Sequence, residues 1–182
     1  GFYIPYHQAD RWFRQAVAGR RDVVLLVGTE PQLRWRTFVR TILDLAHQIN
    51  VSTIVTLGGL LADVPHTRPT RITGSSNTLQ LTERLGQLGV HGSRYEGPTG
   101  ILGVLNATAG QEQLKTISMW GNVPHYVSAS LNPKVAGALL EKVDALLGFG
   151  LDLREWQAMT VRFEAEVAEA VARNPQVAAY IR

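Results

Sequence analysis

Two short apolar runs that flank an amphipathic stretch set the strongest constraint on the fold. Residues 23–27 are apolar on both faces and residues 53–57 are rich in β-branched side chains, and both patterns are typical of buried strands. Between them, apolar residues from Trp35 to Ile49 recur at helical spacing. The three segments predict a β-α-β unit in which two neighbouring parallel strands are joined by a right-handed crossover.

The rest of the chain continues the alternation of strands and helices. Residues 101–109 fit a helix or a strand, and we favour the helix. Together with residues 116–120, the two runs above predict a mostly parallel central sheet, so the fold class is α/β. The other expected elements are a short edge strand at 70–73 and helices at about 78–88, 133–147 and 152–173. The last of these helices carries an apolar stripe that includes Phe163, Val167 and Val171.

The length and composition of the chain limit which classes of protein it can belong to. The 182 residues, 45% of them hydrophobic, suffice for one full-sized domain, which we place at residues 1–150, followed by a C-terminal helical segment at 151–182. The net charge of +3 is too small and the arginines too scattered to predict nucleic-acid binding. No apolar run approaches the roughly 20 residues of a membrane helix. The chain has no cysteine, which excludes disulfides and thiolate chemistry and is compatible with a cytoplasmic protein.

Polar side chains follow the ends of three predicted strands. The most distinctive segment comes after residues 53–57, where Gly58 and Gly59 are expected to let the backbone turn sharply into a loop bounded by Pro65 and Pro69. Because the carboxyl ends of parallel strands meet at one edge of a sheet, we expect the loops to converge there. A Gly-Pro-Thr-Gly turn before the predicted helix at 101 offers further backbone amides to an anion. The candidate ligand-binding residues are Glu30, His66, Thr67, Arg68, Thr99, His125 and Tyr126.

These residue types leave two interpretations open. In the first they form one polar pocket, in which Arg68 binds a carboxylate or phosphate, His66 or His125 transfers a proton, and Glu30 accepts a hydroxyl. In the second they only satisfy backbone groups in stiff, buried loops. No metal is predicted, because no third ligand stands at a familiar spacing from the histidines, and no cofactor or catalytic residue is assigned.

Five segments in this order resemble a known family. The resemblance extends from residue 22 to about residue 181. It rests on Gly28-Thr29-Glu30-Pro31 with Arg34-Trp35, Leu57-Gly58-Gly59 with Val64-Pro65-His66-Thr67-Arg68-Pro69, Tyr95-Glu96-Gly97-Pro98-Thr99-Gly100-Ile101, Trp120 with Val123-Pro124-His125-Tyr126-Val127, and Asn132-Pro133-Lys134 with Leu139-Leu140. Together they are similar to the proteasome assembly chaperone 2 family, in its prokaryotic branch.

The resemblance implies a three-layer α/β/α fold of phosphorylase-like type, with C-terminal helices and a tendency to form homo-oligomers. It implies no known reaction, although eukaryotic members and some archaeal relatives assist or bind the proteasome. We therefore predict a protein-binding or assembly-chaperone-like protein in the cytoplasm, with a proteasome-related protein as a candidate partner and with neither nucleic acid nor membrane as a partner. The alternative is an enzyme acting on a small anionic or nucleoside-like ligand in the crevice at the strand ends.

The chain departs from the family pattern at both ends. The strand-rich segment that the family carries upstream has no counterpart here, so we expect the chain to be an incomplete piece of its parent. In residues 179–182 the tyrosine stands one position earlier than in the hydrophobic-Tyr-any tail of proteasome-binding relatives. Docking through this tail is therefore not predicted.

Overall fold

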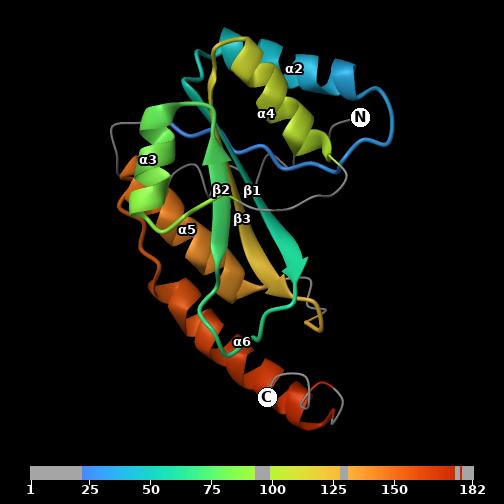
Figure 1. The fold of residues 1–182 in the computed structure, drawn as a ribbon, viewed down its shortest axis with the longest axis vertical. Coiled ribbons are helices and arrows are strands. Elements are labelled where there is room, and N and C mark those ends of the chain that lie inside the picture. The colour runs from blue at the N-terminus through green and yellow to red at the C-terminus, as the bar shows by residue number, and fades with distance from the viewer. Residues whose placement is uncertain (1–21, 93–98, 128–130, 175–176, 178–182) are drawn as a thin grey trace.

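The computed structural model describes residues 22–92, 99–127, 131–174 and 177. In these residues a small open sheet of three strands is flanked by five helices (Figure 1), which confirms the α/β class. The elements in chain order are α2 (Trp35–Gln48), β1 (Thr53–Ala62), β2 (Ile72–Ser76), α3 (Leu79–Gln87), α4 (Ile101–Gln111), β3 (Lys115–Pro124), α5 (Pro133–Leu147) and α6 (Arg154–Ala172).

The described sheet is mixed, with the order β1-β3-β2. Strand β1 pairs with β3 in parallel over its whole length, and β2 pairs with β3 antiparallel from Ile72 opposite Gly121 to Ser76 opposite Ile117. The predicted edge strand is thus present, shifted to 72–76. The prediction of a mostly parallel sheet is not confirmed, because this sheet has one parallel and one antiparallel pair.

The predicted strand at 23–27 is wrong. These residues follow an irregular path, and Val27 is 90% exposed. An apolar run becomes a strand only where a neighbour offers backbone partners, and among the described residues no strand pairs with the free edge of β1. The predicted β-α-β unit is therefore absent, and the parallel pair β1–β3 is instead connected through β2, α3 and α4.

The two glycines after residue 57 lie inside β1 and not in a turn, so their predicted role is wrong. Gly58 stands opposite Trp120 in the register of β1 and β3. A Cβ atom at Gly58 would lie 2.4 Å from Cζ3 of Trp120. Glycine is needed here because a large cross-strand side chain covers the strand closely. The chain leaves β1 only after Ala62.

Two apolar clusters form the core. Side chains of β2, β3, α3 and α5 make the first, in which Leu85, Ile117 and Met119 are almost fully buried. Side chains of α2 and α4 make the second. In β1, Val55 packs against the first cluster and Ile54 against the second. Because successive residues of a strand point to opposite faces, the two clusters cover opposite faces of the sheet.

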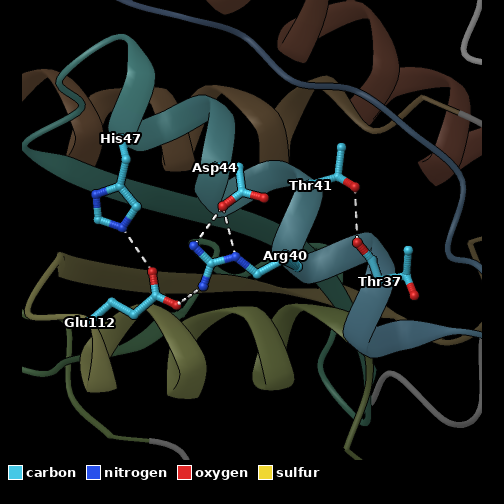
Figure 2. A network of polar contacts seen from close by, with 6 residues as sticks. All are labelled: Thr37, Arg40, Thr41, Asp44, His47 and Glu112. Carbon is cyan, nitrogen blue, oxygen red and sulfur yellow. Dashed lines mark hydrogen bonds and ion pairs between the residues drawn. The ribbon is translucent and has the colours of Figure 1, made fainter.

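A polar network joins α2 to the end of α4 (Figure 2). The Arg40 guanidinium donates to Asp44 within α2 and to Oε1 of Glu112, with N···O distances of 2.7 and 2.6 Å. The other carboxylate oxygen of Glu112 lies 2.8 Å from Nε2 of His47. The arginine and histidine are about half exposed, so each ion pair adds little stability by itself. They link α2 to the end of α4 on the solvent side of the two helices, whose buried side chains pack together in the second cluster.

Helix α5 begins and ends where local chemistry predicts. The Asn132 side chain accepts a hydrogen bond from the Val135 backbone amide, and α5 ends at Gly148, which has φ of 72°. Helix α6 packs against α5, and none of its 19 residues is buried. Its second half continues beyond the sheet (Figure 1). The division of the chain at residue 150 stays a prediction.

Candidate functional site

A cleft of about 220 Å³ lies where β1 and β3 end. Its walls come from the loop at 64–71, the end of β3, the N-terminus of α5 and one side chain of α6. This position is where parallel strands commonly place a ligand site. Its polar lining residues are His66, Arg68, Thr70, Arg71, Asn122, Asn132 and Lys134. Its apolar lining residues are Val64, Pro65, Pro69, Pro124, Val127, Val135 and Phe163.

His66 and Tyr126 join the loop after β1 to the end of β3. The Tyr126 hydroxyl accepts a hydrogen bond from the His66 backbone amide at 2.7 Å and lies 3.0 Å from Nδ1 of the same residue. Burial lowers the pKa of His66 below its ordinary value of 6.5, and the nearby Lys134 ammonium lowers it further. When His66 is neutral and its Nδ1 carries no proton, that nitrogen can accept the tyrosine O–H.

His125 lies on the other side of Tyr126. The two imidazole rings meet the phenol ring edge-on, with centroids 5.9 Å away for His66 and 5.4 Å away for His125. Nδ1 of His125 is 3.1 Å from a carboxylate oxygen of Asp63, and both side chains are substantially exposed. The structure therefore brings three predicted residues together as a His-Tyr-His row at the strand ends.

Lys134 holds three elements together at the cleft. Its ammonium donates to the His66 carbonyl oxygen at 2.5 Å and forms an ion pair of 2.6 Å with Glu164. The loop after β1, the first turn of α5 and the middle of α6 are thereby linked. With these contacts the charge of Lys134 is compensated within the protein, and its side chain is only 16% exposed.

Glu30 lies elsewhere, so its predicted convergence on this cleft is wrong, and Thr99 also lies at the start of α4. Oε1 of Glu30 accepts a hydrogen bond from the Ile101 backbone amide at 2.8 Å, at the start of α4. The other end of α4 is fixed beside the start of β3, where the Leu114 amide donates to the Ala109 carbonyl. About 12 Å of helix runs beside about 33 Å of strand, which separates Ile101 from the end of β3 by at least about 15 Å.

The remaining predicted residues divide as follows. Arg68 lines the cleft with His66, whereas Thr67 is exposed and does not line it. Ligand binding by any of these residues stays a prediction. The sequence analysis missed Arg71 and Lys134 as cleft residues. The spacing of Arg71 from Arg68, just past Pro69, was a usable signal, but nothing local indicates that Lys134 reaches His66.

A second cleft of about 340 Å³ runs along α6. It adjoins the first cleft, with which it shares the lining residues Val127 and Phe163. Tyr126 lines it together with residues of the apolar stripe predicted for the last helix, Val167 and Val171 among them.

In the described ranges there is no cluster of three potential metal ligands. No helix in the part of the chain that the structure describes is long and apolar enough to cross a membrane.

Comparison with known proteins identifies relatives of this fold. The model of the PAC2 family matches residues 3–171. A proteasome-assembly chaperone homologue from Mycobacterium tuberculosis is 40% identical, with a TM-score of 0.78 over 90% of this chain and 68% of that chain. A PAC2 family protein from Streptomyces avermitilis is 35% identical, with a TM-score of 0.74 over 85% of this chain and 64% of that chain. The chain thus spans about two thirds of the length of both relatives.

A more distant likeness concerns the fold alone. PbaB from Pyrococcus furiosus, described as an archaeal proteasome activator, is 19% identical, with a TM-score of 0.63 over 79% of this chain and 62% of that chain. A search of curated protein sequences found no match.

Proposed function

Because the chain belongs to the PAC2 family, we propose that it is a protein-binding, assembly-chaperone-like protein with a proteasome-related partner. The membership confirms the resemblance to the proteasome assembly chaperone 2 family, and the relatives at 35% and 40% identity are bacterial. Relatives described as proteasome-assembly chaperone homologues or activators support the choice of partner.

One structural observation carries the proposal, the apolar stripe of α6, which is only partly buried. Phe163, Val167 and Val171 are only partly buried in a helix of 19 residues, and they line the second cleft beside Tyr126. Apolar surface gathered in a groove and rimmed by polar residues is typical of a protein-interaction site. A partner segment laid along this groove would remove that surface from water.

The test compares two valines of the same helix. Val167→Asp places a charge in the groove, whereas Val161→Asp places it at a position that is already 68% exposed. We expect the full chain to retain proteasome subunits on a column, Val161→Asp to retain them equally, and Val167→Asp to lose them. Equal retention by both variants would contradict the assignment of the groove.

Three finer features belong to the same proposal. The chain forms homo-oligomers, for which light scattering across protein concentrations is the test. It works in the cytoplasm. Its complete fold is a three-layer α/β/α sandwich with a mostly parallel sheet, and the apolar clusters on both faces of the described sheet support this arrangement.

The second candidate is an enzyme acting on a small anionic or nucleoside-like ligand. The presence of Arg68 and His66 in one cleft at the strand ends favours it. Under this function, phosphate, nucleotide or carboxylate ligands raise the unfolding temperature of the protein. Stabilisation that Arg68→Ala abolishes, together with no recovered protein partner, would favour the enzyme over the chaperone.

A further inference from the structure

We propose that the first cleft binds the C-terminal carboxylate of a partner protein whose last side chain is apolar. The inference rests on the proposed protein-binding function and names the chemistry of the partner. It is argued from the charge, the size and the rigidity of the cleft between the 64–71 loop and α5.

The cleft carries positive charge that the described residues do not compensate. Within the described residues, the guanidinium groups of Arg68 and Arg71 have neither a hydrogen bond nor an ion pair. Two carboxylates of the neighbouring segments are already engaged, Glu164 by Lys134 and Asp63 by His125. The N-terminus of α5 also faces this region and adds the positive end of a 15-residue helix dipole. An anion is the complementary ligand, and a carboxylate matches the planar fork of an arginine.

The apolar part of the cleft indicates what carries that anion. Half of the lining residues are apolar, with Val127, Val135 and Phe163 among them. The volume of about 220 Å³ is below the roughly 300–1,000 Å³ of ordinary small-molecule sites. The cleft itself encloses less than a whole nucleotide, and a bare inorganic anion would leave the apolar wall unused. An aliphatic side chain next to a terminal carboxylate would contact the apolar lining while the carboxylate pairs with an arginine.

The arginines stand on a loop that is held in place before any ligand arrives. Pro65 and Pro69 fix φ at two positions, and the Arg68 amide closes a turn onto the Pro65 carbonyl at 3.2 Å. His66 between them is fixed by Tyr126 and by Lys134. A loop with this many restraints loses little conformational entropy when it binds.

The test measures the fluorescence polarisation of a labelled peptide, Gly-Gly-Ala-Leu with a free carboxylate, on the full-length chain. We expect the C-terminal amide of the same peptide to bind about tenfold more weakly or worse, because it is uncharged and cannot form an ion pair with an arginine. Replacing the final Leu by Gly should also weaken binding by about tenfold or more, through lost apolar burial. Each altered peptide differs from the original in one group only, so the effect of the carboxylate and the effect of the last side chain are measured separately.

Variants locate the site. Arg68→Gln and Arg71→Gln should each weaken binding of the free-acid peptide by about tenfold or more. Arg36→Gln, on the exposed side of α2, should bind it as the unchanged chain does. Arg68 and Arg71 are exposed, and an unaltered unfolding temperature will show that these variants are folded.

Equal binding of acid and amide, or unchanged binding by both cleft variants, would overturn the inference. Inorganic phosphate or isovalerate binding as tightly as the peptide would overturn it as well, because the site would then take a free anion. If Arg68→Gln and Arg71→Gln retain proteasome subunits while Val167→Asp loses them, the proposed function stands and the cleft assignment fails. If the peptide binds with acid selectivity and no protein partner is retained, the cleft assignment stands and the proposed function fails.

Discussion

The contact between Gly58 and Trp120 makes a quantitative prediction for stability. In Gly58→Ala the new Cβ would lie 2.4 Å from Cζ3 and 2.6 Å from Cε3 of the indole. Carbon atoms in contact prefer about 3.5–4.0 Å, so the ring or the strand must move by about 1 Å. The ring cannot turn away freely, because its Nε1 donates to Ser118 Oγ at 2.9 Å. Overpacking of this kind lowers the free energy of unfolding by about 1–3 kcal/mol.

The assay is urea unfolding followed by far-ultraviolet circular dichroism, arranged as a double-mutant cycle. Trp120→Leu removes the obstructing ring, so Gly58→Ala should cost less than about 0.5 kcal/mol in that background, and the coupling energy should exceed about 1 kcal/mol. Gly59→Ala is the matched control, because among the described residues its Cβ would meet Val123 Cγ2 alone, at 3.1 Å, and we expect a smaller loss. A neutral Gly58→Ala, or an equal cost in both backgrounds, would refute the steric explanation of this glycine.

Two further predictions concern a helix end and the cleft. Gly148→Ala should lower the free energy of unfolding by about 1 kcal/mol, because a φ of 72° strains an L-residue. In the same denaturation assay, Gly86→Ala in α3 should raise the free energy of unfolding by up to about 1 kcal/mol, because alanine favours the helix. A change of the same sign in both variants would contradict this reasoning. His66 should titrate below pH 6.5 by NMR. The pKa of His66 is lower in the folded than in the unfolded chain. The contribution of neutral His66 to the free energy of unfolding is therefore complete above about pH 6.5, and it is lost as the pH falls through the pKa of the folded state. A titration midpoint at or above 6.5 would show that the burial argument is wrong.

The elements that the sequence predicted well are those decided by neighbouring residues. Asn132 caps α5 and Gly148 ends it, as their local chemistry indicates. The strand at 23–27 could not be judged in this way, because strand formation depends on a partner that is distant in sequence. Gly58 was misinterpreted for the same reason, since only the register of β1 against β3 shows that Trp120 covers it.

The same limit applies to the candidate site. The loop with two prolines correctly indicated that His66 and Arg68 stand at the end of a strand. The position of Glu30 depends instead on how far α4 reaches along β3, which no local pattern records. Lys134 is brought to His66 by the packing of α5, and its contact with the loop is visible only in three dimensions.

Helix α4 has an unusual consequence for how the protein finds its final alignment. Its sequence, Ile101–Gln111, contains no charged side chain and is built largely from small and aliphatic residues. Apolar burial is not directional, so by itself it defines the position of such a helix along its axis only weakly. Polar contacts add that definition: Glu30 accepts from the first amide, Asn106 in the middle donates to Thr56 Oγ1, and Glu112, held by Arg40 and His47, lies just past the last turn. Polar contacts at both ends and in the middle of α4 therefore help to define its axial position against α2 and the sheet.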